Sequence, residues 1–315
     1  MAGNSAFDKL AGVQSASQLE RIIEDDETLV TFLMEAGILP ASRNCPTPDC
    51  GRPMTLNRAV RRSDKYRWVC RGGACAGREV SVRDKTIFSD SKMPMRQIIH
   101  LIFEWSRDGD RDTVAADVGC HLNTVYSWFK ILREAAALHV RNSHQILGGT
   151  GETIEVDESV LVKRKANRGR MPANAQKWVV GGICRRTRRC FFELVEDRSM
   201  GTIESVIGRH VASGTTIMTD GWRSYNNLDE RGFGHMVVNH SLYFVCPLDR
   251  NVHTQNIENR WRWLKRFLSD KGSHKGNIET YMEEYLFRNR CACANVSVFA
   301  AILQIVVNMN RDGLG

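Results

Sequence analysis

The sequence lacks the patterns that mark several common classes of protein. It has no run of 18 or more apolar residues, and residues 1–9 lack the charged-then-apolar order of a signal peptide. It also has no Walker loop, no nucleophile elbow and no glycine-rich dinucleotide motif after a strand. We therefore expect a soluble, intracellular protein with no membrane partner, whose chemistry differs from that of these nucleotide-binding and hydrolase classes.

The chain is long and basic. Its 315 residues carry a formal net charge of +8 and a pI of about 9.0, with Lys and Arg spread through the whole length. This length exceeds what one core usually organises, so we expect two or three domains. The charge favours a polyanionic partner, and nucleic acid is the first candidate.

Four of the ten cysteines occur as two pairs. Four residues lie inside each pair and nineteen lie between the pairs, which is the pattern of a zinc ribbon with one structural Zn²⁺. The alternative is that these are unrelated buried cysteines. The expected zinc ligands are Cys45, Cys50, Cys70 and Cys75. We expect the others to be small apolar residues, namely Cys120, Cys184, Cys190, Cys246, Cys291 and Cys293.

Residues 94–142 have the apolar spacing of helices, interrupted by a turn at Gly119. Helix, short turn and helix is the order of a helix-turn-helix, whose second helix would enter a major groove of DNA. The alternative is a helical hairpin that packs on a catalytic core. Under the first interpretation the residues facing DNA are Asn123, Thr124, Tyr126, Ser127 and Lys130.

The apolar period changes from residue 150. Strands are expected at 153–157, 177–184, 190–195, 215–220 and 235–238, with a helix at 202–211 and another from Thr254. This order is typical of an α/β fold with a mixed sheet covered on its faces, as in a ribonuclease H-like domain. The N-terminal residues 1–42 predict one short helix around Leu29 to Leu33, which serves as a docking arm or as an extra helix.

Three acidic residues are placed where a fold could aim them at shared metal ions. Asp157 lies near the end of a strand, Asp220 closes a strand just before Gly221, and Glu258 lies at the edge of a helix stripe. Phosphodiester cleavage can be driven by two Mg²⁺ or Mn²⁺ ions about 3.5 to 4 Å apart, held by carboxylates. Any one of these acids alone is as well explained as a cap, a turn residue or a surface charge. The stripe consists of Ile257, Trp261, Leu264 and Leu268.

Basic residues surround these acids in the sequence. Lys265 lies seven positions, or two turns, after Glu258 on the same helix line, where it could hold a DNA phosphate, and Arg262 adds charge. Residues 163–170 follow the first acidic strand and would grip a DNA backbone; the alternatives are a flexible loop or a nuclear import signal. The basic residues of this stretch assigned to DNA are Lys163, Arg164, Lys165 and Arg168.

Three further residues are secondary candidates or have two interpretations. Trp263 could stack on a base, but we expect it in the core. His253 could contact a phosphate or orient a metal-bound water, and a neutral histidine that caps a helix is the alternative; His240 lies where a strand ends, near the expected site.

From Cys45 to about residue 290 the chain resembles the Merlin transposases of eukaryotic DNA transposons and the related bacterial insertion-sequence transposases. The motifs that carry the resemblance are RWVCR (67–71), RDKTIFSDSKM (83–93), VDES (156–159), TDGWRSY (219–225), VNHS (238–241), HTQNIENRWRWLK (253–265) and YMEEYLFR (281–288). The resemblance implies a DDE transposase, named after its two Asp and one Glu. In such an enzyme Asp157, Asp220 and Glu258 would bind two Mg²⁺ or Mn²⁺ ions, cut at terminal inverted repeats and join the freed 3′ ends to target DNA.

The resulting expectation is a cut-and-paste transposase that acts on double-stranded DNA as a homodimer or higher oligomer. We expect it in the nucleus if the source is eukaryotic, and otherwise in the cytoplasm or nucleoid. A host-adopted DNA-binding protein without transposition, or a ribonuclease H-like nuclease, are the alternatives. The expected domains are an N-terminal arm (1–42), a zinc ribbon (43–85), a helix-turn-helix domain (90–147), the catalytic domain (150–300) and a C-terminal tail (301–315), which we expect to be a core helix.

Overall fold

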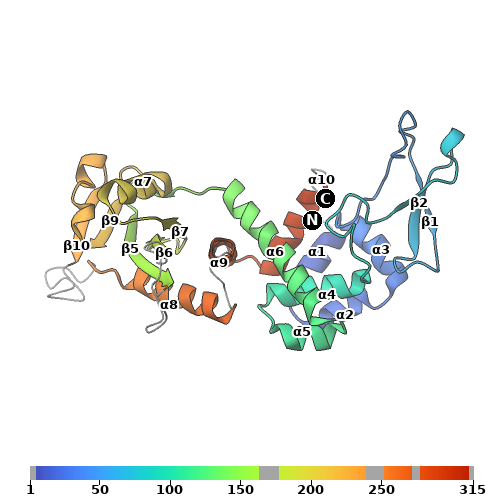
Figure 1. The fold of residues 1–315 in the computed structure, drawn as a ribbon, viewed down its shortest axis with the longest axis horizontal. Coiled ribbons are helices and arrows are strands. Elements are labelled where there is room, and N and C mark those ends of the chain that lie inside the picture. Colours follow the sequence, from blue (N-terminus) through green and yellow to red (C-terminus); the bar gives the residue numbers. More distant parts are fainter. Residues whose placement is uncertain (1–4, 163–176, 239–251, 272–276, 312–315) are drawn as a thin grey trace, which may run out of the picture. The chain divides into compact units, whose positions relative to one another are not determined.

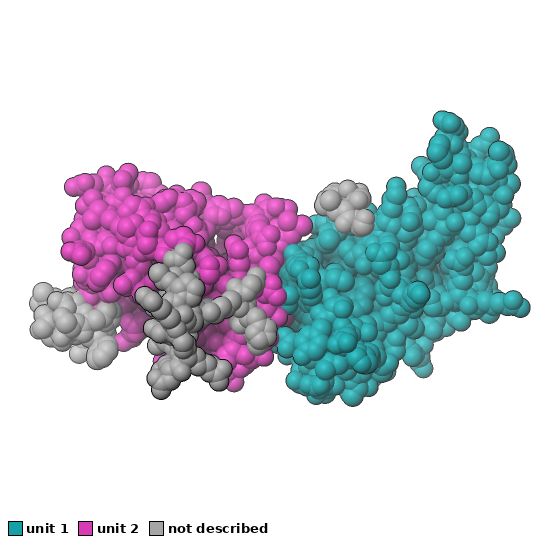
Figure 2. Space-filling model, in the orientation of Figure 1, with its two compact units in different colours: residues 1–136, 295–315 teal, residues 137–294 magenta. Residues whose placement is uncertain are grey.

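The computed structural model describes residues 5–162, 177–238, 252–271 and 277–311 (Figure 1). The chain forms two compact units, which are coloured separately in Figure 2. Unit 1 comprises residues 1–136 together with 295–315, and unit 2 comprises residues 137–294. Unit 1 is therefore built from two separate stretches of the chain, and unit 2 lies between them in sequence.

Unit 1 begins with three short helices, α1 (Ala6–Ala11), α2 (Ala16–Ile23) and α3 (Asp26–Glu35). Each begins at a polar cap, because the side chains of Ser5, Ser15 and Asp25 accept hydrogen bonds from the first-turn amides. The helix expected around Leu29 to Leu33 is confirmed as α3, whereas α1 and α2 were not anticipated.

The C-terminal helix α10 (Val298–Arg311) belongs to the core of unit 1. It packs against α1 and against α4 (Met95–Ser106), where the rings of Phe103 and Phe299 meet edge to face at 5.2 Å. Ile302 and Val306 are fully buried. The prediction of a C-terminal core helix is confirmed.

A three-stranded antiparallel sheet in unit 1 contains the paired cysteines. Its strands β1 (Thr55–Arg58), β2 (Tyr66–Val69) and β3 (Glu79–Ser81) follow one another in the order of the chain, and the short 3-10 helix η1 (Gly73–Cys75) lies between the last two. Thr55 pairs with Val69 and Arg67 pairs with Ser81. The strand expected before Cys70 is β2.

Helices α4, α5 (Arg111–Val118) and α6 (Leu122–Asn142) follow. Gly119 ends α5 in the left-handed conformation with φ of 67°, which favours glycine and turns the chain into α6. Val114, Val118, Val125 and Leu132 are buried, in agreement with the apolar spacing of this stretch. Two helices joined by a short turn are thus present, and the DNA-binding interpretation of them stays a prediction.

Unit 2 contains a five-stranded mixed sheet in the order β10-β9-β5-β6-β7. The strands β5 (Thr153–Val162), β6 (Lys177–Cys184) and β7 (Cys190–Val195) are antiparallel neighbours, whereas β9 (Thr216–Asp220) and β10 (Gly234–Val238) run parallel to β5. A separate pair joins β4 (Leu147–Gly148) to β8 (Val211–Ala212). The five expected strands are therefore present, with β5 longer than predicted.

Helices lie on both faces of this sheet (Figure 1). Helix α7 (Met200–His210) covers one face, where Ile203, Val206 and Ile207 pack with Ile154 and Val156 of β5. Because side chains alternate along a strand, Glu155 and Asp157 point to the opposite face. Helix α8 (Gln255–Asp270) packs on that opposite face, and α9 (Ile278–Cys293) contacts both α8 and β7.

Among the helices that the structure describes, no single one is long and apolar enough to cross a membrane; α9 and α10 reach that length only when the two are counted together. The cysteines outside the paired set are mostly packed inside the units. Cys184, Cys190 and Cys291 are buried, and Cys120 and Cys293 are partly buried. Cys246 lies outside the described residues.

Candidate active site and metal centre

Asp157 and Asp220 lie at the same level on neighbouring parallel strands. The register pairs Thr153 with Thr216 and Glu155 with Met218, and continuing it by two residues brings Asp157 beside Asp220. Paired residues of parallel strands point to the same face of the sheet, which here is the face covered by α8. The strand alternation seen in the sequence therefore places both carboxylates toward the helix that carries Glu258.

The indole of Trp261 fixes Asp157 in place. Its Nε1 donates a 2.9 Å hydrogen bond to Asp157 Oδ2. Its ring packs over Gly181, the residue of β6 that pairs with Asp157. A Cβ at Gly181 would lie only 2.6 Å from a carbon of the Trp261 ring, so this position has room for no side chain. Glycine on β6 thus lets α8 approach the sheet at the level of the acid.

The charges of Asp220 and Glu258 affect the pKa of Asp157. Burial raises the pKa of Asp157 to about 6, and the charges of Asp220 and Glu258 add to the rise, although hydrogen bonds from the Glu158 amide and Trp261 oppose it. The other two carboxylates also have fixed contacts: the Trp222 amide donates to Asp220 Oδ1 at 3.0 Å, and the Thr254 hydroxyl donates to Glu258 Oε1 at 3.1 Å. Each acid accepts a hydrogen bond from a neutral group.

These acids do not converge as tightly as ligands of one ion. Within the described ranges, the four paired cysteines are the only group of three or more His, Cys, Asp or Glu side chains whose ligand atoms all lie within 4.8 Å of one another. A pair of ions about 4 Å apart, each about 2 Å from its ligands, accommodates outer carboxylates roughly 8 Å apart. A two-ion site therefore does not require all three carboxylates to lie within 4.8 Å of one another.

Glu155 has a different role from Asp157, although it lies only two residues earlier on the same face of β5. It is fully buried and pairs with Arg185 at 2.7 Å. Its carboxylate also accepts hydrogen bonds from the backbone amides of Asn256 and Ile257 at 2.8 and 3.1 Å, and from the Asn256 side chain at 2.6 Å. An anion at a helix N-terminus is favoured by the free amides and the helix dipole. Glu155 therefore holds the first turn of α8 against β5 and positions Glu258.

Glu158 was not anticipated as part of the site. It follows Asp157 on the other face of β5 and pairs with Val180 of the α7-side core. Burial raises its pKa to about 7, and the charges of Asp157 and Asp220 contribute. Its Oε1 is buried without a hydrogen-bond partner among the described residues. The only sequence signal for Glu158 was the VDES motif, because strand alternation assigns it to the face opposite Asp157.

The basic residues predicted on α8 are exposed. Lys265 and Arg262 are exposed, as is Glu258 at the edge of the stripe, whereas Ile257, Trp261, Leu264 and Leu268 form the expected buried stripe. The prediction that Trp263 packs in the core was wrong, because 49% of its surface is exposed and Arg266 lies over its ring at 5.9 Å. Trp263 stands two residues after Trp261, about 200° around the helix, and so points away from the sheet.

The remaining predicted residues divide into those described and those that are not. His253 precedes α8: its backbone oxygen accepts a hydrogen bond from Arg185 at 2.7 Å, and its Nδ1 lies 3.5 Å from Glu155 Oε1. His253 therefore lies next to Glu155, which holds the first turn of α8. The predicted DNA contacts Lys163, Arg164, Lys165 and Arg168, together with His240, lie outside the described residues.

The predicted DNA-facing residues of α6 share its outer side. Asn123, Tyr126, Ser127 and Lys130 are exposed, and Thr124 is half-buried. The guanidinium of Arg111 on α5 lies over the Tyr126 ring at 5.1 Å. Their exposure leaves them accessible to a partner.

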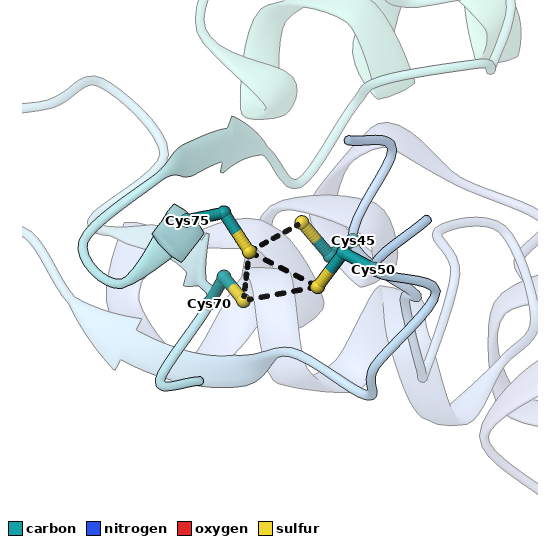
Figure 3. Close-up of side chains that lie close together, drawn as sticks. All are labelled: Cys45, Cys50, Cys70 and Cys75. Carbon is teal, nitrogen blue, oxygen red and sulfur yellow. Dashed lines mark hydrogen bonds between the residues drawn. The ribbon is translucent and has the colours of Figure 1, made fainter. Parts of the chain in front are cut away.

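The paired cysteines meet in space (Figure 3). Sulfur atoms are 3.8 Å apart for Cys45 and Cys75 and 3.9 Å apart for Cys50 and Cys70. These two distances match the edge of about 3.8 Å expected for four thiolates 2.3 Å from a tetrahedral Zn²⁺, whereas the Cys75 sulfur lies closer to those of Cys50 and Cys70, at 3.0 and 3.4 Å. Gly51 and Gly77 turn the two cysteine loops with φ of 53° and 86°. The longer loops between the paired cysteines thus still bring four sulfurs together, and this cluster could bind zinc.

We expect Asp157→Asn to stabilise the metal-free protein above pH 6. Asp157 has a folded-state pKa of about 6, so its charge is disfavoured in the folded state at neutral pH, by on the order of 2 kcal/mol. At pH 4 the carboxyl is protonated in the folded chain and about half protonated in the unfolded chain, so most of the advantage of the variant should be lost. Chemical denaturation with a chelator at pH 7.5 and pH 4 measures the difference. An equal effect at both pH values would show that the charge of Asp157 is not the cause.

Replacing Glu155 by Gln should destabilise unit 2 by about 3 kcal/mol, because Arg185 would lose its buried counter-charge and the first turn of α8 its anion. Glu152→Gln is the matched control. Glu152 pairs with Arg186, whose side chain is 74% exposed, and such pairs contribute at most about 1 kcal/mol. Denaturant unfolding measures the free energy of unfolding of both variants, and the loss should be clearly larger for Glu155→Gln. Similar losses in the two variants would show that Glu155 does not hold α8 in place.

The purified chain should contain one zinc ion, held by the four cysteines. Cys70→Ser should abolish stoichiometric zinc and unfold the β1–β3 sheet, since small metal-bound modules depend on the ion for folding. Cys184→Ser, which changes a buried cysteine far from the cluster in sequence, should retain the metal. Elemental analysis measures zinc, and amide hydrogen exchange in residues 45–81 measures folding. A zinc-free native chain with a protected ribbon would contradict this prediction.

Comparison with known proteins connects this geometry to a family. Two curated relatives are similar to the chain. The first is the "Male abnormal protein mab-31" of Caenorhabditis elegans, 20% identical over 302 residues, or 87% of this chain and 66% of that protein. The second is an "Uncharacterized transposase-like protein" of Haemophilus influenzae, 27% identical over 114 residues, or 35% of this chain and 90% of that protein. The chain thus spans just under two thirds of the length of the worm protein.

A family model covers most of unit 2. Residues 146–289 match the ISXO2-like transposase domain. The matched stretch includes the sheet, α7, α8 and most of α9, and with them the three acids. Residues 146–289 are thus similar to a transposase domain, and the second relative is described as transposase-like.

Proposed function

We propose that the protein is a DNA transposase that cuts at the terminal inverted repeats of its element and joins the freed 3′ ends to target DNA. The observation that supports this proposal is that Asp157 of β5 and Asp220 of β9 point to the sheet face on which α8, the helix that carries Glu258, packs. The pKa of Asp157 responds to the other two charges. The transposase-domain match over the same residues supports the assignment.

The donor set fits two divalent cations such as Mg²⁺ or Mn²⁺. Carboxylate oxygens are the ligands that these hard ions prefer. The charges of Asp220 and Glu258 help to raise the pKa of Asp157, and a bound cation would relieve this repulsion. The same argument explains why Glu155 is not a proposed metal ligand. Its charge is already neutralised by Arg185. Asp157 and Asp220 instead accept hydrogen bonds from neutral donors, the Trp261 indole and the Trp222 amide. When bound, the ions would supply charge stabilisation for the attacking and leaving oxygens of the phosphodiester.

The residues of the chain itself position these ligands. Trp261 holds Asp157 from α8, the Trp222 amide holds Asp220 at the end of β9, and Thr254 holds Glu258 one turn before it. Glu155 fixes the start of α8, so that Glu258 stays at the level of the two aspartates. Such positioning matters because small displacements of catalytic groups lower rates steeply.

We further propose that exposed basic residues bind the DNA duplex. Lys265 and Arg262 on α8 would hold phosphates next to the acids, and the stretch containing Lys163, Arg164, Lys165 and Arg168 would add backbone contacts. The zinc ribbon and the α5–α6 pair would recognise the element's ends. Cutting two ends together requires at least two copies of the chain, so the active form would be a dimer or larger, acting in the nucleus of a eukaryotic host.

A second candidate function is a host-adopted DNA-binding protein that does not transpose. The similarity to a worm protein whose name refers to male abnormality, and not to transposition, favours it. The presence of all three acids favours the enzyme. A nuclease that cuts without joining would be distinguished from both by its products.

The test of the proposed function is metal-dependent cutting and joining. Full-length protein is mixed with Mg²⁺ and duplexes that carry the inverted repeats flanking its gene, and the products are resolved on denaturing gels. Asp157→Ala should lower the cutting rate by on the order of 10³-fold or more, because it removes a ligand that supports several kcal/mol of charge stabilisation.

Glu152→Ala is the matched control, since it removes a carboxylate five residues earlier that pairs with exposed Arg186. It should leave the rate within about a factor of three. Full cutting by Asp157→Ala would overturn the site assignment. Specific binding without any cutting by the unaltered protein would favour the second candidate.

A further inference from the structure

Two tryptophans and an arginine form a stack at the edge of the acidic site. The guanidinium carbon of Arg198, which precedes α7, lies 3.8 Å from the ring centroid of Trp178 on β6 and 4.8 Å from that of Trp222, which follows β9. Cations over indole faces are attracted by the ring electrons. The three side chains come from separate elements, so the fold brings them together.

Hydrogen bonds fix the orientation of this stack. Trp222 Nε1 donates to the Ser224 hydroxyl at 2.9 Å, and that hydroxyl donates to the backbone oxygen of Arg198, also at 2.9 Å. Ser224 itself is buried in the 3-10 helix η3 (Arg223–Tyr225). These two hydrogen bonds hold the Trp222 indole in a fixed orientation.

The stack adjoins the acids directly. The backbone amide of Trp222 donates to Asp220 Oδ1 at 3.0 Å, so one residue both orients a predicted metal ligand and presents an indole. Trp178 pairs with Val160 of β5, on the α7 face of the sheet, so the link between the stack and the acids is made by Trp222. A group resting on Trp222 would lie next to Asp220, whose carboxylate the amide of the same residue holds.

The side chain of Trp222 is partly exposed, whereas several other tryptophan side chains of the protein are buried. Its exposed fraction is 39%, whereas Trp261, Trp68 and Trp105 are at most 5% exposed. Arg198 accounts for one contact of the indole, and the exposed part offers an apolar surface backed by positive charge. That combination suits a nucleobase, whose flat ring stacks on aromatics while its phosphate is attracted to the cation.

We propose that Trp222, backed by Arg198 and Trp178, is a platform on which an unpaired base of the DNA strand stacks next to the cleavage point. A base inside a duplex has both faces covered by its neighbours, so the platform would select single-stranded or opened DNA at the site. Stacking of this kind tolerates any base, because every base has a flat face. This proposal rests on the proposed function, since it names the DNA feature that the same site holds.

The test uses the full-length protein with a fluorescent single strand. The probe is a thymidine decamer with one central 2-aminopurine, whose fluorescence is quenched when it stacks on an indole, in the presence of Ca²⁺. The unaltered protein should quench it on binding. Trp222→Ala should weaken binding about 10-fold, within the range measured for loss of one stacked base, and should abolish the quenching, whereas Trp222→Phe should retain most of the affinity.

Trp263→Ala is the matched control. It also removes an exposed indole with an arginine over its ring, but that indole points away from the sheet, so the quenching should persist. Thermal unfolding of each variant checks that the fold is intact. Equal affinity and quenching for Trp222→Ala and the unaltered protein, or no binding of the probe at all, would overturn the platform.

The outcome is separable from that of the proposed function. Asp157→Asn should abolish cutting but still quench the probe, because Asp157 does not contact the stack through any described hydrogen bond. Quenching that depends on Trp222 in a protein that never cuts DNA would reject the transposase proposal and retain the platform. Cutting that is unchanged in Trp222→Ala, together with unchanged quenching, would reject the platform alone.

Discussion

The buried carboxylate of Glu155 is the contact on which the geometry of unit 2 depends. It lies on the central strand of the sheet and binds the first amides of α8, a helix that begins 100 residues later. Arg185, at the end of β6, balances its charge and also binds the chain just before the helix. One ionic group thereby connects two strands and a helix, and it defines where the first turn of α8 lies relative to β5.

Two acids on the same face of one strand thus have opposite uses. Glu155 is compensated by a guanidinium and by a helix terminus, so its charge is neutralised inside the fold. Asp157 receives only neutral donors and remains close to two other negative groups, which makes the folded chain less stable than an uncharged equivalent would be. The partners of the two acids, and not the residue type, therefore distinguish the structural role of Glu155 from the proposed chemical role of Asp157. Retention of a destabilising charge is what is expected of a binding site for cations.

Much of this arrangement could be predicted from local sequence. The stripe Ile257, Trp261, Leu264 and Leu268 follows the helical period, and the alternation of β5 correctly directed Asp157 away from the apolar side, because both patterns are set by neighbours in the chain. Trp263 was misplaced because its size suggested burial while its position on the helix dictated exposure. Glu155, Arg185 and Trp222 could not be assigned, since their partners lie far away in sequence or depend on where a strand ends. The zinc cluster was predictable from spacing alone, because four thiols in two pairs constrain one another.

The division of the chain into units has a consequence for biosynthesis. Unit 1 needs α10, which buries Ile302 and Val306 against helices made some 200 residues earlier. Every residue of unit 2 is synthesised before α10 leaves the ribosome. The usual order, in which the N-terminal domain folds first during translation, is therefore reversed for the helical core of unit 1. Its apolar surface on α4 waits for the last stretch of chain, so premature termination after α9 would leave a complete unit 2 attached to an unfinished N-terminal half.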